Sequence, residues 1–255
     1  MSQDLAGGAA LVIGGSGAIG AAIARKLAST GNDVALSYHG NEAAANAVVA
    51  DVHAVGRQAL ALRVNLEESA TAQAAVASTI ARFGHIHSVV YAAGPKIEFL
   101  YINEITPAEW ARVMAADVNG CFNVVAAVLP HLRERRSGSI VAVLTGAVDR
   151  APPRDILSAA PKAAIQMLIR GVAREEGRSG IRANCVGPGM LDGGIGLSTL
   201  HEHTADYRAK MIRAIPLRRA GTPGEVADVV SFLISAQSAY VSGATIPVAG
   251  GLQLS

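Results

Sequence analysis

A glycine-rich run, Gly14-Gly15-Ser16-Gly17-Ala18-Ile19-Gly20, follows a short apolar stretch and precedes an alanine-rich one of helical periodicity. Glycine permits positive φ and lets backbone N–H groups approach a pyrophosphate, while a helix N-terminus offers partial positive charge. A strand, a glycine turn and a helix in this order form the context of dinucleotide binding. A turn that only packs closely is the alternative. We predict a cofactor site whose residues in this turn are Gly14, Ser16, Gly17, Ile19 and Gly20.

The residues near the second apolar run indicate which dinucleotide would bind. An acidic residue about 20 positions after the glycine turn accepts hydrogen bonds from the ribose of NAD and repels the 2′-phosphate of NADP. The segment Val34-Ala35-Leu36-Ser37-Tyr38-His39 has no such residue. Ser37, His39 and Asn41 could instead donate to a phosphate, which favours NADP over NAD. The alternative is that these residues only form a polar loop.

The elements that must position these residues alternate along the chain. Short runs rich in β-branched residues are separated by longer alanine-rich stretches of helical periodicity, a pattern typical of strand-helix-strand units around a parallel sheet. Strands are predicted over 9–13, 33–38, 59–65, 88–91, 139–144, 182–186 and 245–248. Helices are predicted over 19–29, 41–55, 68–83, 107–135, 158–178 and 223–235. We predict a single α/β domain, and the irregular stretch at about 190–215 is interpreted as a substrate lid.

Composition excludes several classes of protein. Of 255 residues, 51% are hydrophobic and 16% charged, which rules out a disordered chain. The net charge of +2 comes without a long basic run, so nucleic acid is not an expected partner. The uncharged segment 5–24 is interrupted by six glycines, which argues against a membrane span. Cys121 and Cys185 have neither metal-ligand spacing nor a disulfide framework. We therefore expect a cytoplasmic protein with a small-molecule substrate, without a metal site.

Further motifs resemble those of the short-chain dehydrogenase/reductase family over nearly the whole chain. Tyr91-Ala92-Ala93-Gly94 stands where that family usually has Asn-Asn-Ala-Gly, and Asn184-Cys185-Val186-Gly187-Pro188-Gly189 follows the sixth predicted strand. The C-terminal motifs Gly221-Thr222-Pro223-Gly224-Glu225-Val226 and Val248-Ala249-Gly250-Gly251 match best. The resemblance implies a doubly wound Rossmann-type domain with a seven-stranded parallel sheet, a nicotinamide cofactor and a homotetramer formed through helices 107–135 and 158–178.

The resemblance also assigns cofactor contacts. Asn65 takes the place of an adenine-contacting aspartate, Ala93 and Gly94 run along the cofactor, and Pro188 and Gly189 face the nicotinamide. Gly193 replaces a threonine that usually touches the cofactor.

The catalytic positions depart from the family pattern. The family uses a tyrosine as general acid, a lysine four residues later, a serine that polarises the carbonyl and an asparagine that anchors a water relay. Lys162 matches the lysine, but Ser158 occupies the tyrosine position, Thr145 the serine position and Asp117 the asparagine position. No tyrosine occurs between Tyr101 and Tyr207, so no local shift of the alignment restores the motif. A serine hydroxyl is far less acidic than a phenol and cannot simply replace it.

Three hypotheses follow from this departure. The first is a reductase with altered chemistry, acting on a carbonyl or a conjugated C=C bond; 2,4-dienoyl-CoA reductases also have serine at this position. In the second, another residue supplies the proton. The third is a catalytically impaired protein with a cofactor-binding or regulatory role. For the second hypothesis, the candidate proton donors are Tyr207, His201, His203, Asp155 and Tyr91.

Two arginines precede Ser158 and Lys162 in the sequence. Arg150 and Arg154 could bind an acidic substrate or belong to a solvated loop.

Overall fold

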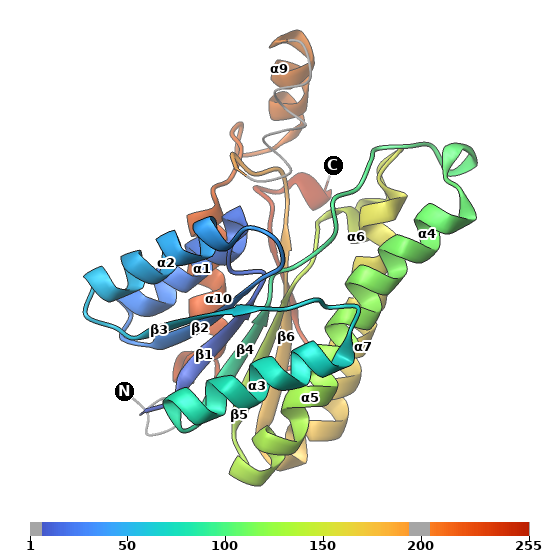
Figure 1. Ribbon diagram of the computed structural model, residues 1–255. Coiled ribbons are helices and arrows are strands. Elements are labelled where there is room, and N and C mark those ends of the chain that lie inside the picture. The colour runs from blue at the N-terminus through green and yellow to red at the C-terminus, as the bar shows by residue number, and fades with distance from the viewer. Residues whose placement is uncertain (1–6, 194–204, 255) are drawn as a thin grey trace.

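The computed structural model describes residues 7–193 and 205–254, and its centre is one parallel sheet (Figure 1). The seven strands lie in the order β3-β2-β1-β4-β5-β6-β7. The strand order reverses between β1 and β4, and in such sheets ligands bind at the carboxyl ends of the strands beside that reversal. The strands are β1 Ala9–Ile13, β2 Asp33–Tyr38, β3 Ala59–Arg63, β4 Ile86–Tyr91, β5 Gly138–Val143, β6 Ile181–Pro188 and β7 Thr245–Val248.

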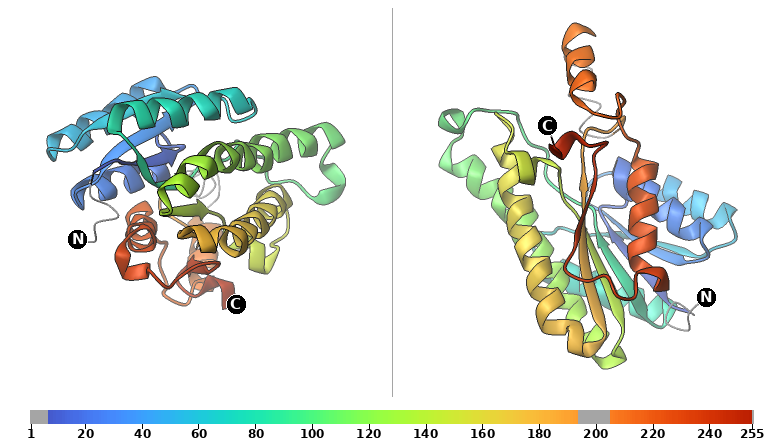
Figure 2. Two further views of the ribbon diagram at one scale, coloured as in Figure 1. Left: turned by 90° about the horizontal axis from the view of Figure 1, so that it is seen from below. Right: turned by 180° about the vertical axis from the view of Figure 1, so that it is seen from behind.

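Helices cover both faces of the sheet (Figures 1 and 2). One face packs against α1, α2 and α10 and the other against α3, α5 and α7. The central strands are therefore apolar on both sides, and all five residues of β1 are buried. The helices are α1 Ala18–Ser29, α2 Glu42–Ala54, α3 Ser69–Phe83, α4 Pro107–Met114, α5 Gly120–Arg135, α6 Ala147–Arg150, α7 Ile156–Glu176, α9 Ala205–Ala214 and α10 Pro223–Ile234. Short 3-10 helices occur at Ile102–Glu104, Gly177–Ser179, Ala236–Ser238 and Leu252–Leu254, and a π-type turn occurs at Ala115–Asn119.

Pro107–Arg135 is the one helical run, within the described residues, that is long and apolar enough to cross a membrane by length and composition alone. Its Cys121, Val124, Val128 and Leu132 belong to the core on one face of the sheet. We therefore interpret it as a core helix.

The predicted strands and helices are confirmed, with ends displaced by up to two residues. The residues of the segment 5–24 that the structure describes form β1, the glycine turn and the start of α1. Two features differ from the prediction. The helix predicted over 107–135 contains the π-type turn Ala115–Asn119, and α9 lies inside the stretch expected to be irregular. Figures 1 and 2 show α9 projecting above the carboxyl edge of the sheet, and residues 194–204 of the predicted lid lie outside the described residues.

Candidate active site

The glycine turn between β1 and α1 has a geometry that only small residues allow. Gly14 has φ of 80°, and a Cβ there would lie 2.8 Å from the carbonyl oxygen of Ala92. A Cβ at Gly20 would overlap the carbonyl of Gly14. Gly17 differs, because a Cβ there would meet only the Gly14 oxygen at 3.4 Å, and its side toward the carboxyl edge is otherwise open.

The same turn fits the pyrophosphate of a dinucleotide. Gly17 is the N-cap of α1 and supplies no side-chain cap, so the first N–H groups of the helix are left for an anionic ligand. No acidic residue stands in the first turn of α1. The backbone therefore offers donors and partial positive charge at the place predicted for the cofactor. Ser16 and Ile19 lie in this turn and the first turn of α1.

The residues predicted to select the cofactor lie at the ends of β2 and β3. The Ser37 hydroxyl is buried and accepts a hydrogen bond of 2.9 Å from the N–H of Gly14, which ties β2 to the glycine turn. His39 is exposed, and its Nδ1 lies 3.2 Å from the carbonyl oxygen of Val64. The Asn41 side chain accepts from Ala44 N and caps α2, so its carbonyl oxygen is already in use. Asn65 donates from Nδ2 to Glu68 Oε1 at 2.7 Å.

Lys162 is the residue on which the predicted catalytic positions converge. Its Nζ donates to the carbonyl oxygen of Ala93 at 2.8 Å and to Asp117 Oδ1, also at 2.8 Å. The two charged side chains are nearly enclosed, with 12% and 4% of their surface exposed. An ion pair taken out of water survives only with good geometry and further hydrogen bonds, and this one has both. The structure therefore brings Lys162, Asp117, Ala93 and the neighbouring Gly94 together.

Tyr91 contacts the Asp117 member of this ion pair. Its hydroxyl donates to the main-chain oxygen of Asp117 at 3.0 Å and lies 3.5 Å from Asp117 Oδ1. The π-type turn Ala115–Asn119 presents that carbonyl, and such turns are frequent at functional sites. Gly120 allows the approach, because a Cβ there would lie 3.3 Å from the Tyr91 hydroxyl and 2.9 Å from Leu66 Cβ. This contact was not predicted from the sequence. The available signal was Gly120, a glycine within a helix that allows another residue to approach closely.

Tyr91 is a poor proton donor for a substrate. It is 1% exposed, and burial, together with the nearby Asp117, raises the pKa of its hydroxyl well above the ordinary value. We interpret it as a residue that positions Asp117. Of the other alternative donors, His201 and His203 and the side chain of Tyr207 lie outside the described residues. Asp155 lies within the described residues, and burial raises the pKa of its carboxyl group to about 6.

Thr145 and Ser158 lie on the elements next to Lys162. Thr145 is the second residue after β5, and its hydroxyl accepts from Ala147 N at 3.2 Å. Ser158 is in the first turn of α7, four residues before Lys162 and therefore on the same face of the helix. Pro188 ends β6, and the N–H of Gly189 donates to Val248 at 3.0 Å. All of these positions are at the carboxyl edge of the sheet.

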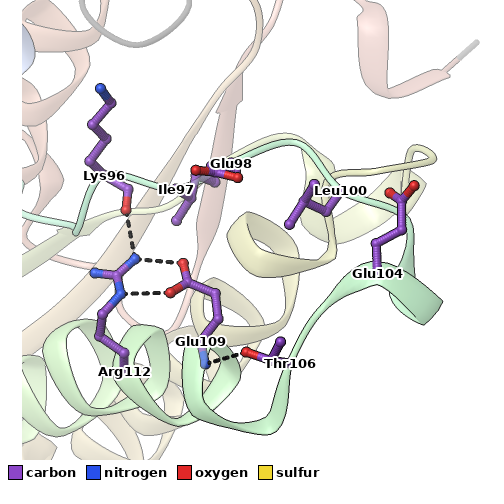
Figure 3. A pocket seen from close by; sticks show the side chains of 8 residues that line it. All are labelled: Lys96, Ile97, Glu98, Leu100, Glu104, Thr106, Glu109 and Arg112. Carbon is purple, nitrogen blue, oxygen red and sulfur yellow. Dashed lines mark hydrogen bonds and ion pairs between the residues drawn. The ribbon is translucent and has the colours of Figure 1, made fainter.

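A groove of about 560 Å³ lies beside this edge, between α4 and the segment that follows Gly94 (Figure 3). Arg112 spans its floor with two bonds to the Glu109 carboxylate and one to the carbonyl of Lys96. None of the predicted site residues lines this groove. Within the described part of the chain, no group of three or more His, Cys, Asp or Glu is arranged to hold a metal ion.

The sheet order, the glycine turn and the lysine at the carboxyl edge define a Rossmann-type α/β domain. Residues 14–253 match a family model described as enoyl-(acyl carrier protein) reductase. The chain is 32% identical over 248 residues to 3-oxoacyl-[acyl-carrier-protein] reductase FabG of Staphylococcus aureus, an alignment that covers 96% of this chain and 98% of that protein. It is 33% identical to the short chain dehydrogenase/reductase AacuN of Aspergillus aculeatus, covering 97% and 96% of the two chains.

Solved structures of the same class superpose closely. Levodione reductase has a TM-score of 0.93 at 28% identity, covering 97% of this chain and 98% of that one. NAD+-bound xylitol dehydrogenase has a TM-score of 0.90 at 28% identity, covering 96% and 98%. The chain belongs to the short-chain dehydrogenase/reductase family and is an NAD(P)-dependent oxidoreductase.

Proposed function

We propose that the protein is an NADP(H)-dependent reductase that acts on a small molecule with a carbonyl or conjugated C=C bond through an altered active site. The observation that carries this proposal is the enclosed Lys162 amine, held at the carboxyl edge between Ala93 and Asp117. Its position beside the predicted nicotinamide site supports a role in the reaction, and the serine at position 158 means that the role differs from that in tyrosine-dependent relatives.

The cofactor would lie along the carboxyl edge of the sheet. Gly14, Ser16, Gly17, Ile19 and Gly20 would hold the pyrophosphate against the N-terminus of α1. Asn65 would contact the adenine, and Ala93, Gly94, Pro188 and Gly189 would line the path to the nicotinamide. His39, exposed directly after β2, would face the 2′-phosphate, and the carboxyl end of β2 has no acidic residue to repel it, which favours NADP. Ser37 would support this end of the site through its bond to the N–H of Gly14. When bound in reduced form, the cofactor supplies a hydride.

The side chains have separate tasks in this proposal. Two of the three N–H donors of Lys162 go to Ala93 and Asp117, which leaves one for the nicotinamide ribose. Ser158 and Thr145 would donate hydroxyl hydrogen bonds to the substrate atom on which negative charge develops. Asp117 would fix the Lys162 amine in place.

The second candidate is a cofactor-binding protein with little catalysis. The Asp117 carboxylate matches the charge of Lys162 at 2.8 Å, and no phenol stands at position 158 to use that charge. Loss of a positioned general acid costs on the order of 10²–10⁴ in rate. This reading predicts cofactor binding without turnover.

Titration of the protein with NADPH and NADH, followed by nicotinamide fluorescence, is the first test. We expect tighter binding of NADPH, and weaker binding by at least about tenfold in Lys162→Ala, because a charge-assisted donor to the ribose is lost. Lys26→Ala, in the last turn of α1 at the opposite end of the helix from the glycine turn, is the matched control. Failure to bind either cofactor contradicts the proposal. With NADPH bound, oxidation on addition of ketones or enoyl thioesters separates the reductase from the binding protein.

We also propose a cytoplasmic homotetramer of single-domain subunits with a lid at about 190–215. A groove of about 360 Å³ between α5 and α7 supports the assembly. It is lined mainly by apolar side chains, including Val125, Leu129 and Leu168.

A further inference from the structure

Asp155 is a carboxylate that the proposed mechanism does not use. It is the last residue before α7, and its carbonyl accepts from Ser158 N at 3.0 Å and Ala159 N at 2.9 Å. Residues spaced by three and seven positions share one face of a helix. Asp155, the N-cap of α7, therefore precedes Ser158 by about one turn. It lies on the same side of the helix as Lys162, which bonds to Ala93 and Asp117.

Within the described residues, the Asp155 carboxylate has no cation and its Oδ1 has no hydrogen-bond partner. Oδ1 is fully buried, and the side chain does not cap α7 despite its position. The adjacent Arg154 is directed elsewhere, because its Nε donates to Phe99 O at 2.9 Å and its guanidinium lies 5.6 Å from the Tyr101 ring centre. A buried acceptor without a partner loses its hydration and gains nothing in return. Oδ2 is not enclosed in this way, so a ligand that donates to Oδ2 would offset part of the cost of burying the carboxylate.

The charges near Asp155 distinguish between kinds of substrate. The ammonium of Lys162 is matched by Asp117, so the pair adds no net positive charge to stabilise an alkoxide. Asp155 adds an acceptor and, when ionised, a negative charge. Such a site suits a substrate that is positive before reduction and neutral afterwards. A protonated imine has this property, whereas a ketone develops negative charge on oxygen and requires an acid.

We propose that the protein reduces C=N bonds, with Asp155 as the catalytic residue that holds the protonated nitrogen of an imine. This inference rests on the proposed NADPH-dependent reductase and names a C=N bond, in place of the carbonyl or C=C bond proposed above, as the bond that is reduced. With the reduced nicotinamide bound, hydride addition to the imine carbon would form the new C–H bond while the π electrons of the C=N bond move to nitrogen. Nitrogen keeps the proton that it shares with the Asp155 carboxylate, and the product is a neutral amine. The nicotinamide is oxidised, the imine carbon is reduced, and no phenol is needed.

Dihydroisoquinoline tests the proposal as a cyclic imine, with cyclohexanone and crotonyl-CoA as carbonyl and enoyl comparisons. We expect NADPH oxidation with the imine at a kcat/KM at least about tenfold above that with either comparison, which corresponds to the loss of one charge-assisted contact. Asp155→Asn should lower imine kcat/KM by about 10² or more and leave the Kd for NADPH unchanged. Asp149→Asn, an exposed acid in α6, is the matched control and should keep the imine activity.

A binding measurement keeps the test independent of turnover and of folding in one variant. Tetrahydroisoquinoline, the product amine, should bind the NADP+ complex of the natural protein and of Asp155→Glu, which keeps a carboxylate, more tightly than that of Asp155→Asn. NADPH binding with no imine reduction overturns the inference and leaves the proposed cofactor site intact. Equal imine activity in Asp155→Asn and Asp149→Asn also overturns it. Absence of NADPH binding overturns the proposed function itself.

Discussion

Lys162 has a fixed partner in Asp117, and this changes what a neighbouring hydroxyl can do. An ammonium within about 4–6 Å lowers the pKa of a phenol, and a carboxylate at similar distance raises it. With both groups enclosed and 2.8 Å apart, their effects on a side chain at position 158 largely oppose each other. In the proposed assignment of the site, serine in place of tyrosine and aspartate in place of asparagine therefore act together on the charge beside Lys162.

Ser158→Tyr alone should therefore create little ketone reductase activity. Ser158→Tyr combined with Asp117→Asn removes the opposing carboxylate while keeping a side chain of similar size beside Lys162. We expect the double variant to reduce cyclohexanone with NADPH at least about tenfold faster than Ser158→Tyr, since a tuned general acid contributes 10²–10⁴. The Kd for NADPH is measured for each variant, so that the ketone activities are compared at saturating cofactor. Equal ketone activity in the single and double variants would show that Asp117 does not restrain the lysine.

Among the elements, the glycine turn could be predicted from the sequence and the π-type turn could not. Strands such as β1 were predictable because buried parallel strands are runs of apolar, often β-branched residues. The glycine turn was predictable because Gly14 and Gly20 are required locally. The π-type turn Ala115–Asn119 was not, because its carbonyl is satisfied by Tyr91 from a distant strand. Helix α9 was missed because its glycine-rich and threonine-rich surroundings obscured its periodicity.

Gly17→Ala tests the function of the glycine turn separately from its stability. A Cβ at Gly17 meets only the Gly14 oxygen at 3.4 Å, so the free energy of unfolding in urea should change by less than about 1 kcal/mol. The methyl group would stand where backbone must approach the pyrophosphate, so the Kd for NADPH should rise by about tenfold or more. Gly20→Ala is the contrasting variant, because its Cβ overlaps Gly14 and should destabilise the fold. Unchanged NADPH affinity in Gly17→Ala would place the pyrophosphate elsewhere.

Across the whole molecule, the two ends of the parallel strands have different roles. The candidate site lies at their carboxyl ends, whereas three histidines gather at their amino ends. His131 Nε2 accepts from Ile86 N at 3.1 Å, and His87 is 4% exposed with its Nδ1 3.0 Å from Ser88 Oγ. Burial, with a contribution from Arg135, lowers the pKa of His85, His87 and His131, that of His87 to about 4. Asp33 opposes the shift at His87, and Glu134 that at His131.

This cluster should make folding sensitive to acid. Each imidazole binds a proton more weakly when folded than when unfolded, so protonation favours unfolding and stability falls as pH drops from about 6.5 toward 4. For His87 alone the loss at about pH 5 is about 2 kcal/mol. Urea unfolding across this range should show a smaller decline in His87→Gln, and the same decline as the natural protein in His53→Gln, on the end of α2. Equal pH dependence in both variants would exclude His87 as the source.

Assembly is the property of the whole molecule that the α5 and α7 surface addresses. Phe122 on α5 lines the groove between the two helices and is 55% exposed, and Met167 on α7 is 64% exposed. Exposed apolar side chains gathered on one face mark an interaction surface, and the expected homotetramer would bury them against a second copy.

Light scattering should give a mass of about four times 26.1 kDa for the natural protein. Phe122→Arg should yield smaller species because it buries an unpaired charge. Val55→Arg, an equally exposed apolar position at the end of α2 on the opposite face of the sheet, should leave the assembly intact. A monomeric natural protein, or a Phe122→Arg variant that still forms the tetramer, would contradict the assignment of this surface.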